Sequence, residues 1–530
     1  MPMLEWMRGL FHGGSGRTGR AQVDPRTPLE DWLRDAEARR GAGDSAGAVQ
    51  LCSRILDEDP DHARALCLLG EIAAARGDAG EAEGLFRRAL SIVESNPHLH
   101  YALGCVLASQ GNRAEAEAAY RRALALAPGH ADARVNLGCL LQAGGEADAG
   151  HAGAQGERAT RDLDEAIGHF RAATEIAPDS PDGWINLGYA LAQQRRPGEA
   201  TQAYGRALAI DPELAHARVN RAMALLSQGR WLEAWEDYEW RWQASGFPRP
   251  RFSRPEWDGS DPSQKTIFLY TEQGFGDAIQ FVRYARLLAE RGARVVLRCQ
   301  PELKTLLATA AGVTNALTVA DPEPEFDMHC SLLSLPRLLG TTTETIPGEA
   351  PYLFPAGAGA GAAAAGRRLR VGLVWSSQSA FPGAAQKSLP AEALTPLADI
   401  PGVDFFSLQL GKVSVPSFAR DLTPGIRDFS DTATLIAGLD LTLSVDTAVA
   451  HLAGAMGKPV WVLLPYVADW RWEPDGPASK WYPGMRLFRQ HRRGDWAEVV
   501  ARVAEELRGE LRGLAGTAAT FPTSAGAAGA

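Results

Sequence analysis

Small and aromatic residues recur at fixed positions through the first half of the chain. Alanine returns every 34 residues, apart from one interval of 50, at Ala48, Ala82, Ala116, Ala166, Ala200 and Ala234. Four residues after these alanines stand Cys52, Phe86, Tyr120, Phe170, Tyr204 and Tyr238. Prolines, which end helices, follow at Pro60, Pro128, Pro178 and Pro212. This register predicts a stack of antiparallel helix pairs in which the aromatic residue fills the gap to the next pair.

The other helix of each unit carries a small residue, which lets the two helices approach closely. These residues are Ala36, Gly70, Gly104, Gly138, Gly188 and Ala222. The pattern resembles the tetratricopeptide repeat (TPR) family, which implies a solenoid of six repeats over residues 29–247. Residues 1–28 are expected to be disordered or to form a short helix. The longer interval includes the Gly- and Ala-rich stretch 144–161, which lacks apolar periodicity and is expected to bulge out as a loop.

A solenoid of this kind presents a long concave surface that suits an extended peptide and therefore implies a protein partner. Asn136, Asn186 and Asn220 each stand two residues before the small residue of their unit. A side-chain amide both donates and accepts, so a row of amides can hold a peptide backbone regardless of its sequence. The row resembles the asparagine ladder of the protein O-GlcNAc transferases, which implies that these residues bind the acceptor peptide. The alternative is that the amides only tie adjacent helices together.

In the second half, short apolar runs alternate with helical stretches, as in βαβ units. After a connector at 248–263, strands are predicted at Thr266–Tyr270, Arg294–Cys299, Asn315–Val319, Arg370–Ser376, Val403–Leu410, Leu439–Asp446 and Pro459–Pro465. The Ala- and Gly-rich segment 356–368 suits a flexible linker. The predicted fold is thus an α-helical TPR solenoid followed by an α/β region with lobes at 264–355 and 369–512 and a disordered tail at 513–530. Two Rossmann-like lobes with a joint between them describe the GT-B architecture of glycosyltransferases.

In parallel sheets, ligands bind beyond the carboxyl ends of the strands, where helix N-termini attract phosphates. The segment SVDTAVAHLAGAMGKPVW includes Asp446 at a strand end. It resembles the nucleotide-sugar motif of the heptosyltransferase-like glycosyltransferases of family 9. That resemblance implies that Asp446 binds the donor sugar, that Thr447 and nearby amides bind the diphosphate, and that His451 helps to neutralise it. The alternative for Asp446 is a helix N-cap.

The first strand of the second half runs into a glycine turn that contains Gly274, Gly276 and Asp277. In family 9 a Gly-Asp pair at this place supplies the catalytic carboxylate. The resemblance therefore implies that Asp277 is the general base of an inverting transfer and that the turn contacts the donor. Such a base must lie within hydrogen-bond reach of the hydroxyl that it deprotonates. The alternative is that Asp277 only caps its helix.

Other donor-binding candidates lie in the last lobe. Lys387 and Ser388 match the basic residue and serine that face the donor phosphates in family 9, although a lone loop lysine is usually only solvated. Gln409, at a strand end, could reach the ribose or the base. Aromatic residues at 469–472 and 481–483 either stack on a sugar or fill the core. Lysine, histidine and a helix N-terminus can stabilise a leaving nucleoside diphosphate, so no metal and no cofactor besides the nucleotide-sugar co-substrate is expected.

Composition narrows the function class further. The chain has 530 residues and a net charge of -10 spread along the sequence, which argues against nucleic-acid binding. The six cysteines form no CxxC pair and are predicted to be reduced core thiols. Residues 1–20 lack the apolar stretch of a signal peptide, and no apolar run approaches the roughly 20 residues that span a bilayer. The expected location is the cytoplasm, where activated sugars are made.

The combination of repeats with this catalytic region points to a protein acceptor. A lipopolysaccharide heptosyltransferase acts on a lipid-linked sugar and needs no peptide-binding superhelix, whereas a protein glycosyltransferase does. The sequence therefore predicts O-glycosylation of Ser or Thr in a bacterial protein. Flagellin is a candidate substrate, because some flagellin glycosyltransferases join repeats to such a domain. Two alternatives stay open: transfer to a saccharide or lipid acceptor, and a scaffold whose transferase domain is degenerate.

Overall fold

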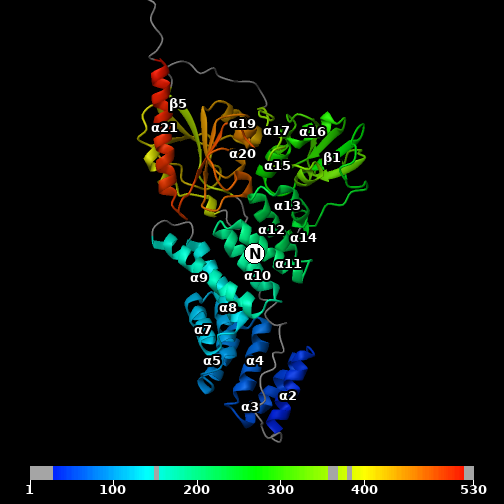
Figure 1. Cartoon of the computed structure of the whole chain (residues 1–530), viewed down its shortest axis with the longest axis vertical. Helices are drawn as coiled ribbons and strands as arrows, with labels where there is room; N and C mark the ends of the chain where they lie inside the picture. Colours follow the sequence, from blue (N-terminus) through cyan, green and yellow to red (C-terminus); the bar gives the residue numbers. More distant parts are fainter. Residues whose placement is uncertain (1–27, 149–153, 247, 356–367, 379–384, 519–530) are drawn as a thin grey trace, which may run out of the picture. The chain divides into compact units, whose positions relative to one another are not determined.

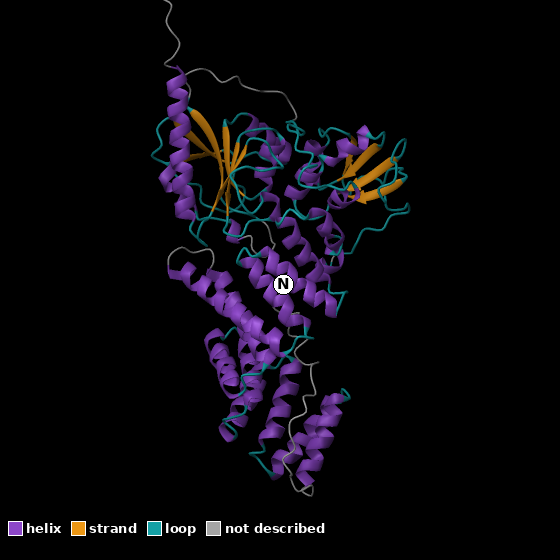
Figure 2. Cartoon of the chain, viewed as in Figure 1, coloured by secondary structure: helices purple, strands orange, loops and turns teal. Residues whose placement is uncertain are grey.

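The computed structural model describes residues 28–148, 154–246, 248–355, 368–378 and 385–518. The chain forms two compact units. One contains residues up to 145 together with 161–190, and the other contains 146–160 together with 191–530. Helices make up the first unit, whereas all described strands belong to the second (Figures 1 and 2).

Thirteen helices form the N-terminal part of the described chain. They are α2 (Pro28–Gly41), α3 (Ser45–Glu58), α4 (Ala63–Arg76), α5 (Ala79–Ile92), α6 (Pro97–Ser109), α7 (Arg113–Leu126), α8 (Ala131–Asp148), α9 (Ala154–Ile176), α10 (Pro181–Gln193), α11 (Pro197–Ile210), α12 (Ala215–Ser227), α13 (Trp231–Tyr238) and α14 (Arg241–Ser245). The predicted helical solenoid is confirmed. No helix in the described residues combines the length and the hydropathy that crossing a bilayer requires.

The repeating small residues have the packing role that their spacing predicts. All six recurring alanines, from Ala48 to Ala234, are fully buried. The glycine of the first helix in a hairpin faces the aromatic ring of the second, so that a Cβ added at Gly104 would lie 2.7 Å from the Tyr120 ring. Gly138 and Phe170 are related in the same way, with a contact of 2.6 Å. The aromatic side chain thus fills the space left by the glycine within its own hairpin, whereas it was expected to fill the gap to the next pair.

Two segments that were expected to be irregular are helical in the parts that the structure describes. The stretch 144–161, expected to be a loop, instead lengthens α8 to Asp148 and begins α9 at Ala154. The last helix, α21 (Trp496–Ala518), runs into the segment 513–530 that was expected to be disordered. Both corrections have one cause: Ala, Glu, Gln, Arg and Leu favour helix, and extending a formed helix needs no new nucleus. Residues 1–27, 149–153, 356–367 and 519–530 lie outside the described residues.

Two sheets follow, and all their described strand pairs are parallel. The first contains β1 (Thr266–Tyr270), β2 (Arg294–Arg298), β3 (Val313–Leu317) and β4 (Met328–Ser331), in the order β3-β2-β1-β4. The second contains β5 (Leu369–Val374), β6 (Val403–Ser407), β7 (Ala419–Asp421), β8 (Leu441–Val445), β9 (Val460–Leu464) and β10 (Met485–Arg489), in the order β10-β9-β8-β5-β6-β7. Intervening helices include α15 (Phe275–Phe281), α16 (Tyr284–Glu290), α19 (Phe429–Ala437) and α20 (Ala448–Ala455). The predicted solenoid followed by an α/β region is confirmed.

Every predicted strand overlaps an observed one, but three observed strands carry too weak a sequence signal. β4 has the sequence MHCS and β10 has MRLFR, so neither is a run of β-branched residues. β7 is only three residues long. These strands form because neighbouring strands offer backbone partners, which local sequence does not reveal.

The hydrophobic core continues from the last repeat into the α/β region. One cluster of buried residues includes Trp231 and Trp235 of α13, Ile267 of β1, and Trp470 and Trp481. The second sheet has a further cluster, to which α21 contributes several residues. The last repeat hairpin is therefore packed as part of the second unit.

Buried charges also join α14 to the end of β1. Arg241 is 4% exposed and donates to the carboxylates of Glu239 at 2.8 Å and Glu272 at 2.6 Å. It also donates to the Ser334 hydroxyl at 2.9 Å. The hydroxyl of Ser331, the last residue of β4, donates to Glu272 as well. A buried guanidinium without such partners would be strongly unfavourable, so these groups hold one another in place.

We expect Gly104→Ala to destabilise the repeats, because the added methyl group would overlap the Tyr120 ring. Overpacking of this kind costs about 1–3 kcal/mol. The control is Gly84→Ala on the exposed face of α5, where an added Cβ meets nothing within 4 Å. Urea unfolding followed by circular dichroism should give a lower midpoint for Gly104→Ala and an unchanged or higher one for the control. Equal midpoints would contradict the packing role of Gly104.

Arg241→Met should lower the free energy of unfolding by about 3–5 kcal/mol, because it leaves the Glu239 and Glu272 carboxylates without their buried cation. Arg230→Met is the control, because Arg230 forms only an exposed pair with Glu233 and should change little. Guanidinium unfolding monitored by tryptophan fluorescence measures both. A similar small effect for both variants would mean that the Arg241 network contributes no stability.

Candidate functional site

The predicted site residues follow strands at the places where the strand order reverses. In the first sheet the chain adds strands on one side of β1 up to β3 and then places β4 on the other side of β1. In the second sheet it adds β6 and β7 on one side of β5 and then places β8, β9 and β10 on the other side. The strand order therefore reverses between β1 and β4 and between β5 and β8. Ligands of such sheets bind outside the carboxyl ends of the strands at the reversal. Asp446 directly follows β8, Lys387 follows β5, and Asp277 lies in the first turn of α15, after β1.

Lys387 and Asp446 form a close ion pair. The Lys387 Nζ lies 2.5 Å from Asp446 Oδ2, and the Asp446 side chain is only 7% exposed. Burial alone would lower the pKa of Lys387, but the Asp446 and Asp469 carboxylates outweigh it and raise that pKa. Lys387 is therefore held as a cation at the reversal point of the second sheet. Ser388 lies beside it, and its hydroxyl accepts from the Ser377 amide at 2.9 Å.

Thr447 is the N-cap residue of α20, and its hydroxyl lies 3.0 Å from that of Ser444. No side-chain capping bond is formed at this helix end. The Asp446 carboxylate, for which capping was the alternative, is directed instead to Lys387. The first turn of α20 thus begins just after β8 without a side-chain cap, which leaves the helix N-terminus open to an anion such as phosphate.

His451 is buried within α20. Its Nδ1 lies 2.9 Å from the Tyr482 hydroxyl, its ring stacks on Trp472 at 4.9 Å, and its Nε2 lies 3.9 Å from Asp446 Oδ1. Burial lowers the pKa of His451 to about 3, so the imidazole is neutral at physiological pH. A neutral ring can form hydrogen bonds but does not carry the charge that was expected of His451.

Asp277 caps its helix, which is one of the two roles that the sequence left open, and it also pairs with Arg471. Its Oδ2 accepts from the Gly274 amide at 3.1 Å, which caps α15, and its Oδ1 accepts from Arg471 at 2.5 Å. Burial raises the pKa of this carboxyl, although Arg471 opposes the shift. A carboxylate with a raised pKa is a better proton acceptor than an ordinary aspartate.

Arg471 is the site residue that sequence reasoning missed. It lies in the short helix η5 (Trp470–Trp472), its side chain is 9% exposed, and it contacts Asp277 at 2.5 Å and Asp469 at 2.9 Å. Burial would raise the pKa of Asp469, but Arg471 and Lys387 hold it below its usual value. The charges of Asp469 and Arg471, after the last predicted strand, were a signal that their aromatic neighbours obscured.

The glycine turn allows α15 and α20 to touch. A Cβ added at Gly276 would lie 2.9 Å from His451 Cδ2 and 3.7 Å from Ala448 Cα. Gly274 precedes α15 with an extended backbone and donates its amide to Asp277. Gly276 was expected to contact the donor, but the space beside it is filled by His451. Its lack of a side chain serves helix packing.

Gln409 supports the strand ends. Its Oε1 accepts from the amides of Trp375 at 3.0 Å and Ser376 at 2.8 Å. Its Nε2 donates to the carbonyls of Ser376 and Leu410. The amide is thus fully engaged and 4% exposed, so the expected contact with ribose or base would have to displace backbone bonds.

The aromatic residues near the site fill the core and do not form an open platform. Trp470, Trp472, Trp481 and Tyr482 are at most 4% exposed. Trp231 of α13 stacks on Trp481 at 5.5 Å and meets Trp470 edge-on at 5.5 Å. Of the two interpretations of these rings, the structure therefore favours core packing.

The three asparagines of the predicted ladder differ in their surroundings. Asn136 is 6% exposed and donates to the Tyr101 hydroxyl at 3.3 Å and to Cys105 Sγ at 3.5 Å on α6. Asn186 is half-buried and donates to the Asp182 carbonyl of its own helix. Asn220 is also half-buried. Asn136 therefore ties adjacent helices together, whereas the other two retain exposed surface.

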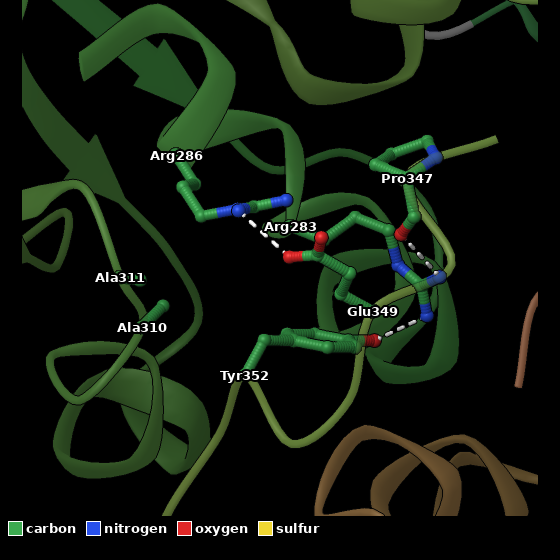
Figure 3. Close-up of a pocket in the computed structure, with 7 residues that line it drawn as sticks. All are labelled: Arg283, Arg286, Ala310, Ala311, Pro347, Glu349 and Tyr352. Atoms are coloured by element: carbon green, nitrogen blue, oxygen red, sulfur yellow. Dashed lines mark hydrogen bonds and ion pairs between the residues drawn. The ribbon is translucent and has the colours of Figure 1, made fainter. Parts of the chain in front are cut away.

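Figure 3 shows a cavity beside Arg283, lined also by Arg286, Ala310, Ala311, Pro347, Glu349 and Tyr352. Its volume is about 10 Å³, near the lower limit for a single water molecule. Arg283 donates to the Pro347 carbonyl at 3.1 Å and to the Tyr352 hydroxyl at 2.7 Å. The cavity is too small for a nucleotide-sugar, and none of the predicted site residues lines it.

In the described residues of the first unit, Cys67, Glu71 and His98 bring three metal-ligating atoms within 4.8 Å of one another. Glu71 already accepts from His98 at 2.8 Å and forms an ion pair with Arg40. Its charge is therefore compensated without a metal ion.

Comparison with known proteins finds relatives of the repeats and of part of the α/β region. Models described as tetratricopeptide repeat match residues 33–97, 97–130, 151–215 and 185–244. Protein FlbA of Caulobacter vibrioides is 28% identical over 383 residues, which cover 65% of this chain and 64% of FlbA. This alignment covers 65% of the chain, whereas the part before residue 264 is only about half of it, so the alignment includes part of the α/β region. The peroxisomal targeting signal receptor of Eremothecium gossypii is 41% identical over 78 residues, 15% of this chain and 14% of the receptor.

Among solved structures, YrrB, a TPR protein with an unusual peptide-binding site, aligns with 35% of this chain and 88% of its own, at 24% identity and a TM-score of 0.29. PilW, a type IV pilus biogenesis factor, aligns with 42% of this chain and 96% of its own, at 18% identity and a TM-score of 0.36. The chain spans less than two thirds of the length of the curated relatives named above. Its tetratricopeptide repeats indicate protein–protein interaction.

Proposed function

We propose that the α/β region is a GT-B glycosyltransferase of the heptosyltransferase-like kind, and that the repeats present a protein acceptor to it. The observation that carries the proposal is the meeting of Lys387, Asp446, Asp277 and Arg471 at the reversal points of two parallel sheets. Two fixed cations and the N-terminus of α20 suit a diphosphate. Two carboxylates suit a sugar hydroxyl and a proton transfer.

In the proposed reaction, Asp277 removes the proton from an acceptor hydroxyl as the hydroxyl oxygen attacks the anomeric carbon. The bond between that carbon and the phosphate oxygen breaks, and the nucleoside diphosphate leaves with the electron pair. Lys387 and the amides of α20 stabilise the developing negative charge. Asp446 holds the donor sugar, and the neutral His451, whose Nε2 lies 3.9 Å from Asp446 Oδ1, forms a hydrogen bond to the donor. The product has an inverted anomeric configuration, because attack and departure occur on opposite faces.

The proposed acceptor is a Ser or Thr hydroxyl of a bacterial protein such as flagellin. The repeats support this choice because arrays of this type bind peptides and proteins. The half-buried Asn186 and Asn220 are the proposed backbone contacts. A carbohydrate or lipid acceptor would give the repeats no direct part in transfer.

The donor proposal is tested by thermal-shift measurements with UDP-, GDP-, ADP- and CMP-sugars. At a ligand concentration of 100 Kd, stabilisation of about 2.7 kcal/mol is expected for the correct nucleotide.

Asp277→Asn should abolish transfer but retain donor binding, whereas Asp261→Asn, in an exposed turn, should leave transfer unchanged. Because burial raises the pKa of Asp277, wild-type transfer should decline, as the pH falls, at a pH above the usual aspartate range. Failure of every nucleotide-sugar to stabilise the protein would favour a scaffold.

The acceptor proposal predicts that Asn186→Ala combined with Asn220→Ala lowers kcat/KM for a protein acceptor, by about tenfold if two backbone hydrogen bonds are lost. Donor hydrolysis in the absence of acceptor should stay unchanged. Asn136→Ala is the comparison, because this buried residue should affect the unfolding midpoint more than the kinetics. Steady-state kinetics with a protein acceptor and with a short peptide measures both effects. Unchanged acceptor kinetics in the double variant would assign these amides a purely structural role.

A further inference from the structure

Every charged group of the candidate site is already paired within the protein. Lys387 contacts Asp446 at 2.5 Å, and Arg471 contacts Asp277 at 2.5 Å and Asp469 at 2.9 Å. Three carboxylates therefore surround two cations. A diphosphate brought beside this arrangement would be repelled by the carboxylates unless one of them gave up its cation.

Arg471 is the cation that can change partners without leaving its place. One terminal nitrogen is fixed by Asp469, which also accepts from the Arg471 amide at 3.0 Å. The Trp470 ring, with its centroid 4.8 Å from the guanidinium carbon, further confines the group. The other terminal nitrogen contacts Asp277, and the Nε has no hydrogen-bond partner in the described residues.

The edge of the guanidinium that faces Asp277 thus has two donors: Nη2, which contacts Asp277, and Nε, which has no partner in the described part of the chain. An unsatisfied buried donor is unfavourable, and the side chain of Arg471 is 9% exposed. A phosphate group accepts two parallel N–H bonds from one guanidinium, a geometry that a single carboxylate oxygen does not use. A phosphate oxygen pair would therefore satisfy this edge better than Asp277 does.

We propose that Arg471 binds the diphosphate of the donor by exchanging Asp277 for phosphate oxygens, so that donor binding releases Asp277 to act as the base. The proposal rests on the proposed glycosyl transfer and adds an anion-binding residue and an order of events to it. Before the donor arrives, Asp277 Oδ1 is occupied by Arg471 and Oδ2 by the Gly274 amide. After the exchange, Oδ1 is free to accept the proton of an acceptor hydroxyl.

The exchange predicts that substitution of Asp277 and substitution of Arg471 change nucleotide affinity in opposite directions. Asp277→Asn removes the competitor of the phosphate and should tighten nucleoside diphosphate binding by about three- to tenfold, equivalent to less than about 1.4 kcal/mol. Arg471→Gln should weaken it by about tenfold or more. In the double variant, the Asp277 substitution should lose its tightening effect, because its benefit depends on Arg471.

The experiment is isothermal titration calorimetry of the full chain with UDP, GDP, ADP and CDP, on the wild type, the two single variants and the double variant. The Arg471→Gln background separates the exchange from a general charge effect, because removal of the Asp277 charge alone would favour an anion in both backgrounds. Arg471→Lys retains the charge but not the two parallel donors, and it should bind more weakly than wild type. Circular dichroism and melting temperature establish that each variant is folded.

Tightening by Asp277→Asn in the wild-type background alone supports the exchange. Tightening of equal size in both backgrounds, or no tightening, overturns it and leaves the proposed transferase intact if the wild type binds a nucleotide and transfers sugar. Absence of binding by any nucleoside diphosphate to the wild type contradicts both proposals. If the two variants that carry Arg471→Gln do not fold, Asp277→Asn and Arg471→Lys still decide the outcome, because the exchange requires their affinities to move in opposite directions.

Discussion

The packing of Trp231 determines where the candidate site lies. This residue of α13 is 3% exposed, stacks on Trp481 and meets Trp470 edge-on. Trp470 directly precedes Arg471, so the segment that carries Asp469 and Arg471 is held against the last repeat hairpin. Buried aromatic pairs of this kind contribute about 0.5–1.5 kcal/mol each beyond the burial of their surface. A side chain of the repeat array thereby fixes the place of a cation in the α/β region.

Two buried arginines in the second unit show how differently charge can be accommodated. The hydrogen bonds of Arg283 in the described residues go to neutral oxygens. They include the Pro347 carbonyl and the Tyr352 hydroxyl (Figure 3), and also the Trp481 carbonyl. These oxygens satisfy the guanidinium donors of Arg283, and none of them is a charged partner that an anionic ligand could replace. Arg471 instead faces two carboxylates, and one of its donors lacks a partner. The first arrangement is that of a structural support, and the second suits a ligand-binding residue.

How much the sequence predicts depends on whether a feature is local. The 34-residue period is local: it follows from the alanines and the Gly104–Tyr120 type of contact, and it gives the hairpins correctly. Strands such as β8, which are buried throughout, are also evident from their composition. The pairing of Arg471 with Asp277 could not be found in this way, because the two residues are 194 positions apart and no local pattern joins them. Similarly, the neutral state of His451 follows from the rings that enclose it, and the sequence does not reveal these neighbours.

The absence of a side chain at position 276 links a local feature of the sequence to the packing of the candidate site. Because Gly276 has no Cβ, α15 can approach α20 until the space beside it is filled by His451, where a methyl group would come within 2.9 Å of that ring. The same approach brings Asp277, the next residue, near Lys387, whose positive charge opposes the rise in the pKa of the Asp277 carboxyl. A larger residue at position 276 would separate α15 from α20. It would thereby move the Asp277 carboxylate, which follows the first sheet's β1, away from the Lys387 cation, which follows the second sheet's β5. The glycine turn therefore serves the proposed chemistry through helix packing, by setting the distance between groups that belong to different sheets.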